Sequence, residues 1–143
     1  MRYTGEFRHT LDAKNRIIIP AKFRAGLGDT FMVSKWLDGC LAVFPMETWN
    51  DVAERMSRMS AGKKESRQFM RKLMSSANEC TFDSQGRVQL PQLLLEKGGF
   101  VKNCAIIGVG DRVEIWPLEK WEAYSDEAEE VFDAVAEELT EYI

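Results

Sequence analysis

Two pairs of an aspartate and an arginine are the residues in this chain best suited to bind a ligand. Each pair has the form Asp-x-x-x-Arg: Asp12 with Arg16, and Asp83 with Arg87. The guanidinium group is a planar fork that suits a phosphate, or the O6 and N7 atoms of guanine in the major groove. The alternative is an internal salt bridge, in which the aspartate caps backbone N–H groups and the arginine covers it. We predict that the aspartates structure the local backbone and that the arginines bind DNA.

Both pairs lie within an internal repeat, which fixes the architecture and so precedes any other interpretation. Residues 82–91 repeat residues 11–20 with the aspartate, the arginine and the final proline at the same positions, and residues 116–121 repeat residues 44–49. The chain therefore contains two copies of one unit. Each copy presents its arginine at the same point of a loop.

A turn between two strands is predicted to hold each pair. Residues 6–11 alternate weakly between polar and apolar types, and residues 16–19 include a β-branched run. Between them, Asp12 and Asn15 favour a turn, because their side chains bond to nearby backbone and tolerate a left-handed φ. Gly86 takes the position of Asn15 in the second copy, and glycine adopts a positive φ at little cost. Both copies thus predict a strand–turn–strand unit.

A short helix is predicted to follow each of these units. Pro20 and Pro91 suit the first turn of helices over residues 21–27 and 92–97, where the missing proline N–H is not needed. Glycines close to the end of both segments favour helix termination there.

A second hairpin completes each copy. Strands over residues 31–34 and 41–44 are predicted to pair through a loop that contains Asp38-Gly39, a strong hairpin signal. The second copy repeats the arrangement with strands over residues 105–108 and 113–116.

Helical segments separate and follow the two copies. Apolar residues recur at helical spacing over residues 45–59 and again over residues 65–77, which predicts two amphipathic helices. The same pattern from Ser125 to the end of the chain predicts a final helix, with Asp126 and Glu127 favourable near its N-terminus.

Charge is strongly segregated along the chain. The formal net charge of −4, taken over the whole chain, disfavours binding to nucleic acid. However, residues 1–24 carry six Lys and Arg against two acids, and residues 55–72 carry seven against one. From residue 118 onward there are ten acids and one base. A chain that is acidic overall can therefore still present a basic face.

Three further side chains are candidates for that face. Lys14 lies in the first turn, Arg24 lies on the helix after Pro20, and Gln85 lies in the second turn, where its amide can read a base edge. The position of Arg24 is Leu95 in the second copy, so the first copy is the more cationic half. The predicted DNA-binding residues are Arg16, Arg87, Lys14, Arg24 and Gln85, and the predicted turn-structuring residues are Asp12, Asp83, Asn15 and Gly86.

The sequence predicts neither catalytic residues nor a metal or cofactor. His9 is the only histidine, so no zinc site of usual composition and no Ser-His-Asp triad stands out. An enzyme with Asp12 and Asp83 as an acid–base pair is the weakest interpretation, because each has a cation nearby and a role in a turn. The glycines around Leu27 lack the rest of a phosphate-binding motif.

The remaining composition is typical of an intracellular protein. Cys40, Cys80 and Cys104 are odd in number and lack Cys-x-x-Cys spacing, which favours reduced thiols. The first residues contain no apolar run, so we predict neither a signal peptide nor a membrane span.

The paired turns, the flanking hairpins and the two Pro-x-Glu-x-Trp segments resemble the MraZ family, the duplicated members of the SpoVT/AbrB swapped-hairpin group. The resemblance covers nearly the whole chain. It matches Asp12 and Arg16, and Asp83 and Arg87, to the two signature motifs of the family. An arginine that binds DNA in AbrB-type proteins aligns with Arg24, whereas Asn15 replaces the usual glycine.

The resemblance implies an α+β, β-rich fold: a pseudo-twofold, double swapped-hairpin AbrB-like β-barrel with a helical insert and a C-terminal helix. Residues 5–47 would form the first SpoVT/AbrB-like repeat and residues 76–119 the second. Residues 48–75 would be the helical insert, and residues 120–143 the C-terminal acidic helix. Because no low-complexity linker divides the chain, we expect one integrated body.

The resemblance also implies a bacterial transcriptional regulator that binds double-stranded DNA at the promoter of the division and cell-wall gene cluster. It implies self-association into a ring-like homo-oligomer, in the cytoplasm at the nucleoid and not in a membrane. Since several weak contacts on one DNA raise avidity, we expect recognition of closely spaced direct repeats, one per subunit.

Two alternatives stay open at this stage. The basic stretch 55–72 faces either DNA or the acidic tail of a neighbouring subunit, a heterologous contact that would close into a ring. Swapped-hairpin proteins also include antitoxins and other protein-interaction modules, but those usually have one hairpin unit and a flexible tail.

Overall fold

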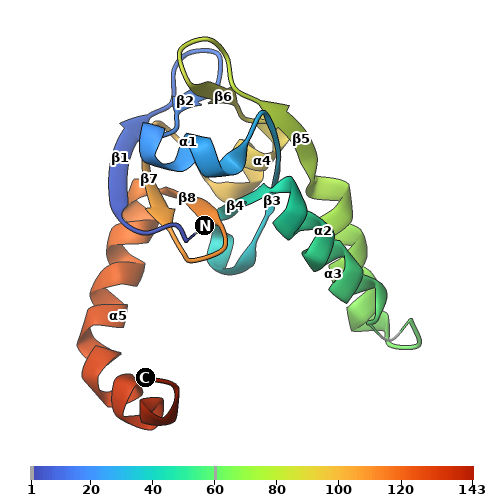
Figure 1. Ribbon diagram of the computed structural model, residues 1–143, viewed down its shortest axis with the longest axis vertical. Helices are drawn as coiled ribbons and strands as arrows, with labels where there is room; N and C mark the ends of the chain where they lie inside the picture. Colours follow the sequence, from blue (N-terminus) through green and yellow to red (C-terminus); the bar gives the residue numbers. More distant parts are fainter. Residues whose placement is uncertain (1, 60) are drawn as a thin grey trace.

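The computed structural model describes residues 2–59 and 61–143 and has an α+β architecture (Figure 1). The first copy comprises β1 (Glu6–Thr10), β2 (Arg16–Ile18), α1 (Ala21–Leu27), β3 (Thr30–Lys35), η1 (Leu37–Gly39) and β4 (Leu41–Pro45). The helices α2 (Met46–Ser57) and α3 (Lys64–Ser76) follow. The second copy comprises β5 (Asn78–Thr81), β6 (Arg87–Gln89), α4 (Gln92–Gly98), β7 (Asn103–Gly108) and β8 (Val113–Pro117), and the chain ends with α5 (Leu118–Glu138) and η2 (Thr140–Tyr142).

Four of the six strand pairings join the two copies, and the hairpins β3–β4 and β7–β8 lie within one copy each. A six-stranded antiparallel sheet has the order β1-β7-β8-β4-β3-β5, and a second, two-stranded sheet pairs β2 with β6. The first strand of each copy therefore pairs with a strand of the other copy, β1 with β7 and β5 with β3. Exchanging the copies leaves the order unchanged, so the strand order is symmetric with respect to the two copies.

The small β2–β6 sheet fixes the position of the two turns. Ile17 pairs with Val88, and their exposed fractions are 1% and 0%. Burial of each β-branched side chain contributes roughly 1.5–3 kcal/mol. A shift of one residue would turn both side chains out of the core. The register of the turns is thus set by the core directly beneath them.

The short helices begin where the prolines predict. Pro20 is the N-cap residue of α1 and Pro91 that of α4. Phe23 of α1 and Leu94 and Leu95 of α4 are buried in the same core. The predicted extent of α1 is confirmed, and α4 ends one residue later than predicted, at Gly98.

The predicted start of the last helix at Ser125 is wrong, because α5 begins at Leu118. Pro117 is its N-cap residue, as Pro45 is for α2. The rings of Trp121 and Tyr124 pack on Trp116, with centroids 5.3 and 4.9 Å away. This aromatic packing stabilises the first turns of α5, which lie before the acidic residues from which the start was predicted.

The helical segments leave the body at the end opposite the two turns, α2 and α3 on one side and α5 on the other (Figure 1). The helices predicted over 45–59 and 65–77 correspond to α2 and α3. Trp49 and Val52 of α2 and Leu73 of α3 are buried against Ala42 and Phe44 of β4. Within the described residues, no helix is long and apolar enough to cross a membrane.

Candidate nucleic-acid interface

The two Asp-x-x-x-Arg turns lie side by side at one end of the molecule, above the β2–β6 sheet (Figure 1). Hydrogen bonds tie each turn to the other copy. Ile19 N–H donates to the carbonyl of Gly86 at 3.1 Å, and Leu90 N–H donates to the carbonyl of Asn15 at 2.9 Å. The turns therefore form one surface and not two separate loops.

The aspartate of the first turn is bonded through both carboxylate oxygens. Asp12 Oδ1 accepts hydrogen bonds from the backbone N–H groups of Lys14 and Arg16, each at 2.9 Å. Asp12 Oδ2 accepts from Arg16 Nε at 2.7 Å.

The second turn repeats this geometry. Asp83 Oδ1 accepts from the N–H groups of Gln85 and Arg87 at 2.9 Å, and Asp83 Oδ2 accepts from Arg87 Nε at 2.7 Å. Asn15 and Gly86 take equivalent positions with φ of 60° and 76°. Asparagine and glycine are the residues that adopt this left-handed conformation most readily.

Each arginine is thus part of its own turn, as in the salt-bridge alternative, yet each also reaches the surface. The side chains of Arg16 and Arg87 are 29% and 25% exposed. Arg87 Nη1 also lies 3.8 Å from Asp12 Oδ2, an ion pair between the copies. Among the described residues, no protein acceptor bonds to the Nη atoms of Arg16. One edge of the Arg16 guanidinium group is thus used within its turn, and the other edge has no protein partner among the described residues.

Arg24 lies against the turn of the other copy. Its Nη1 donates to the carbonyl of Ile19 at 2.6 Å, and its guanidinium group covers Gly86. An open hollow of about 470 Å³ is lined there by Arg24, Ser84 and Gln85, among others. The first copy is the more cationic in sequence, but the guanidinium group of Arg24 lies against the turn of the second copy.

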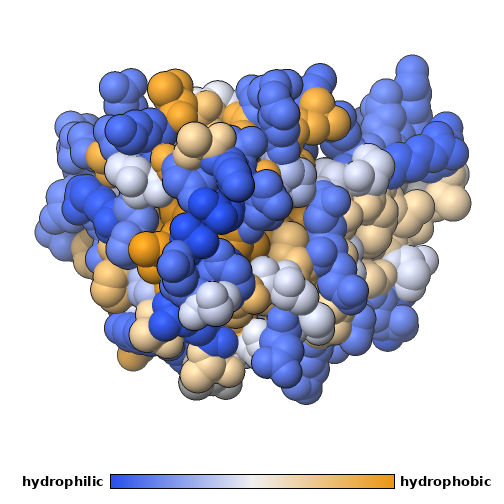
Figure 2. Space-filling model, turned by 90° about the horizontal axis from the view of Figure 1, so that it is seen from above, coloured by the Kyte–Doolittle hydropathy of each residue, from blue (hydrophilic) through white to orange (hydrophobic). Residues whose placement is uncertain are grey.

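The end that carries the turns has a mixed surface. Figure 2 looks onto it from above and shows hydrophilic residues at the centre of this face with hydrophobic residues beside them. Lys14 is exposed, and Arg24 is half-buried. Because Arg16 and Arg87 are each paired with an aspartate, the net positive charge here comes mainly from Lys14 and Arg24.

The hydrogen bonds within the turns lower the pKa of both aspartates. For Asp12 the largest cause is the bond from the Arg16 backbone N–H, and for Asp83 it is the bond from the Arg87 backbone N–H. A pKa below the ordinary 3.8 means that the contribution to stability is complete above pH 3.8 and is lost as the pH falls further.

We therefore expect both turns to keep their geometry from neutral pH down to pH 5. NMR titration of the side-chain carboxyl carbons should give both aspartates a pKa below 3.8. In Arg16→Ala the pKa of Asp12 should rise in part, while that of Asp83 should stay unchanged. An Asp12 pKa at or above 3.8 in the unmodified protein would contradict the geometry.

Sequence reasoning missed Gln89. Its Nε2 donates to the carbonyl of Lys14 at 3.0 Å, and the residue pairs with Arg16 in the β2–β6 sheet. Its exposed position alternates with buried Val88, as expected for the outer face of a strand. The alternation alone could have identified it as a member of this surface.

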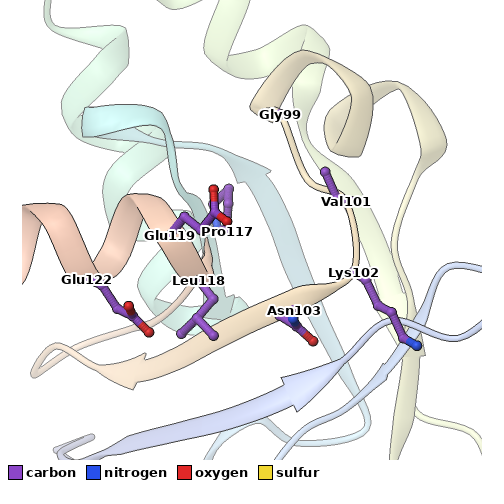
Figure 3. Close-up of a pocket in the computed structure, with 8 residues that line it drawn as sticks. All are labelled: Gly99, Val101, Lys102, Asn103, Pro117, Leu118, Glu119 and Glu122. Carbon is purple, nitrogen blue, oxygen red and sulfur yellow. The ribbon is translucent and has the colours of Figure 1, made fainter.

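A second hollow lies away from the turns, between the loop before β7 and the start of α5 (Figure 3). Its volume is about 420 Å³, and its lining includes Val101, Lys102, Glu119 and Glu122. The acidic side chains on α5 make it unsuited to DNA. Within the described residues, no cluster of His, Cys, Asp and Glu could hold a metal ion.

The three cysteines are free thiols, and Cys40 and Cys104 are buried. Burial raises the pKa of the Cys104 thiol to about 12, which suppresses the reactive thiolate.

Comparison with known proteins identifies relatives along the whole chain. The model of a family described as "MraZ protein, putative antitoxin-like" matches twice, over residues 3–72 and 73–142. The chain is 44% identical to the Transcriptional regulator MraZ of Ligilactobacillus salivarius and 45% identical to that of Natranaerobius thermophilus, with 98% of each chain covered. It is 47% identical to the Transcriptional regulator MraZ of Symbiobacterium thermophilum, over 94% of this chain and 98% of the relative.

Proposed function

The chain belongs to the MraZ family, and on this premise we propose that it is a sequence-specific, DNA-binding transcriptional regulator. Its targets are closely spaced direct repeats in the promoter of the bacterial division and cell-wall gene cluster, and it works in the cytoplasm at the nucleoid. The regulatory role is supported by its similarity to proteins known as Transcriptional regulator MraZ. The observation that carries the DNA-binding role is the pair of turns with the same hydrogen-bond distances, side by side on one surface.

We further propose that the fold is the double swapped-hairpin barrel of the SpoVT/AbrB group. The pairings of β1 with β7, β5 with β3 and β2 with β6 support this, since every one of them joins the two copies. The proposed repeats are residues 5–47 and 76–119, and the insert over residues 48–75 includes residue 60, which lies outside the described residues. The C-terminal acidic segment, residues 120–143, begins inside α5.

Recognition on this surface divides between the two arginine forks and their neighbours. The forks of Arg16 and Arg87 are proposed to read guanine edges or phosphates. Lys14 adds a phosphate contact, and Gln85, at the equivalent position of the second turn, reads a base edge. Arg24 supplies charge next to the second turn.

A single subunit with so few contacts binds weakly, so assembly is part of the proposal. Modules of this size bury about 600–1,000 Å² on DNA. A ring that places several subunits on one DNA raises avidity by about 10²–10⁴ when the spacing of the repeats fits. Direct repeats, and not a single site, are therefore the natural target.

The test is fluorescence anisotropy with promoter DNA that carries tandem repeats, compared with DNA that carries one repeat and with a scrambled duplex. The array should bind at least about 100-fold more tightly than the single repeat at the same salt concentration. Equal affinity for one repeat and for the array would exclude the assembly mechanism. Equal affinity for the scrambled duplex would exclude sequence-specific recognition.

The ring itself is proposed to form between α5 of one subunit and the α2–α3 pair of the next. Residues from 118 onward carry ten acids and residues 55–72 carry seven bases, so the charges are complementary. Exposed apolar side chains line α5, including Val131, Phe132 and Val135 at 48%, 66% and 42%. Exposed apolar residues at this density mark an interaction surface.

We expect Phe132→Ala to weaken assembly by about tenfold or more, the loss of one buried aromatic contact at an interface. Analytical ultracentrifugation should show smaller species, while the thermal unfolding of the subunit stays nearly unchanged because the side chain is exposed. Val101→Ala is the matched control, since Val101 is 91% exposed and lies outside α5. An unchanged size distribution for Phe132→Ala would place the interface elsewhere.

A protein-interaction role is the second candidate, favoured by the words "antitoxin-like" in the family description. A partner protein that purifies in constant ratio with this chain and releases it from DNA would favour this role. Binding to tandem repeats by the purified chain alone favours the first.

A further inference from the structure

Arg24 of the first copy and Gly86 of the second are in direct contact. A Cβ atom on Gly86 would lie 2.5 Å from Arg24 Nη1 and 2.7 Å from Arg24 Cζ, closer than real Cβ atoms approach other groups. Gly86 is buried, although it lies in a surface turn. The guanidinium group of Arg24 therefore fills the space that a side chain at position 86 would need.

Hydrogen bonds connect this contact to the second turn. Arg24 Nη1 donates to the Ile19 carbonyl at 2.6 Å, and the Ile19 N–H donates to the Gly86 carbonyl at 3.1 Å. Gly86 immediately precedes Arg87, whose backbone N–H and Nε both bond to Asp83. Movement of Arg24 would be transmitted to the arginine fork that faces the ligand.

The other half of the molecule lacks this contact. Leu95 takes the position of Arg24 and is buried, and Asn15 takes the position of Gly86 at the same left-handed conformation. The backbone bond is retained, from Leu90 N–H to the Asn15 carbonyl. Arg24 thus faces a glycine, whereas Leu95, its equivalent, corresponds to an asparagine. The two positions therefore differ together between the two halves of the molecule.

We propose that Arg24 is a positioning residue that holds the second turn, and with it Arg87, in the geometry that binds DNA. The inference rests on the proposed DNA-binding function of the turns. It makes the two turns unequal, because Arg24 of the other copy covers the backbone of the second turn at Gly86, whereas Leu95 takes the equivalent position at the first. Position 86 requires glycine for two reasons: its φ is positive, and a side chain there would occupy the space of the Arg24 guanidinium group.

Amide hydrogen exchange tests the contact without DNA. Arg24→Lys keeps the charge but cannot place a guanidinium group over Gly86. Exchange of the amides of Gly86 and Arg87 should become about tenfold faster, as expected for the loss of a charged hydrogen bond, whereas the amides of Asn15 and Arg16 should not change. The matched control is Lys22→Met, which removes a cation from the same helix. Unchanged exchange at Gly86 and Arg87 in Arg24→Lys would overturn the proposal.

A double-mutant cycle tests the consequence for DNA binding. Gly86→Asn introduces the residue that the first copy tolerates at this φ, so its main effect is the collision with Arg24. In the unmodified background it should weaken binding to the tandem-repeat duplex by about tenfold or more, and in the Arg24→Leu background by no more than about twofold. Equal losses in the two backgrounds would overturn the proposal.

These outcomes separate this inference from the proposed function. If the unmodified protein binds no DNA but exchange rises in Arg24→Lys, the function is wrong and the contact stands. If the unmodified protein binds DNA and the two substitutions are additive, the function stands and Arg24 acts through its charge alone.

Discussion

Replacement of Arg87 by alanine is expected to lower the affinity for tandem-repeat promoter DNA by about 10- to 100-fold, the value of one arginine fork on a base or phosphate. Arg87 touches Asp83 of its own turn and Asp12 of the other, and the turn that carries it is in contact with Arg24. The side chain of Arg16 bonds only to Asp12 within the described residues. The loss should therefore be smaller in Arg16→Ala than in Arg87→Ala.

Anisotropy titrations at several salt concentrations separate a ligand contact from a structural effect. If Arg87 contacts a phosphate, its removal should also reduce the log–log salt slope by about one per subunit. If Arg87 reads a base, the slope should stay and discrimination against the substituted base should fall by about 1–3 kcal/mol. Both outcomes assign the residue to the interface.

Asp83→Asn is the matched control for damage to the turn. Asparagine keeps an oxygen for the N–H groups of Gln85 and Arg87 but removes the charge that pairs with the guanidinium group. We expect a modest loss of affinity with the salt slope retained. If Asp83→Asn reproduces the whole effect of Arg87→Ala, the arginine is structural. If Arg87→Ala binds like the unmodified protein, DNA is read elsewhere, first of all by residues 55–72.

Much of the local structure could be predicted because it depends on neighbours in sequence. The starts of α1 and α4 follow from Pro20 and Pro91, and the hairpin between β3 and β4 follows from Asp38-Gly39. Only local backbone preferences are needed for these assignments. The start of α5 was predicted too late because the prediction relied on the polar residues from Ser125 to Glu127, whereas Pro117 is the N-cap residue of the helix.

The arrangement of the site could not be predicted, since it depends on pairing between the copies. The repeat predicts two like turns, but only the β2–β6 register brings Arg87 close to Asp12 and Arg24 against Gly86. The sequence assigned Arg24 to the more cationic first copy, whereas folding places its charge at the second turn. Contacts between residues far apart along the chain depend on the topology.

The asymmetry of the copies extends to an ion pair at the start of β8, between half-buried Arg112 and buried Glu114, also without a sequence signal. Glu114 is 6% exposed, Arg112 Nε donates to its Oε2 at 2.9 Å, and Arg112 Nη2 lies 2.9 Å from the same oxygen. Trp116 Nε1 donates to the same carboxylate at 3.0 Å. The Arg112 guanidinium carbon also lies 5.3 Å from the ring centroid of Trp36.

Arg112→Ala is therefore expected to lower the free energy of unfolding by about 3–5 kcal/mol, because it leaves a buried carboxylate without its cation. Urea denaturation measures this loss. It is a large share of the free energy of unfolding of a typical domain, which is roughly 5–15 kcal/mol. Arg58→Ala is the control. Its pair with Glu54 is exposed, at 72% and 63%, and should contribute no more than about 1 kcal/mol.

The first copy indicates how the loss can be relieved. Ala42 pairs with Glu114 across the β4–β8 ladder and occupies the equivalent position in β4, so an apolar residue is already accommodated there. Arg112→Leu combined with Glu114→Ala should therefore be more stable than Arg112→Ala alone, although Trp116 Nε1 loses its acceptor. If Arg112→Ala lowers the free energy of unfolding no more than Arg58→Ala does, the Glu114 carboxylate finds another partner in the variant. If the double substitution lowers the free energy of unfolding by more than Arg112→Ala does, removal of both charges does not relieve the loss. The ion pair and its neighbours then stabilise the fold in a way that apolar residues cannot replace.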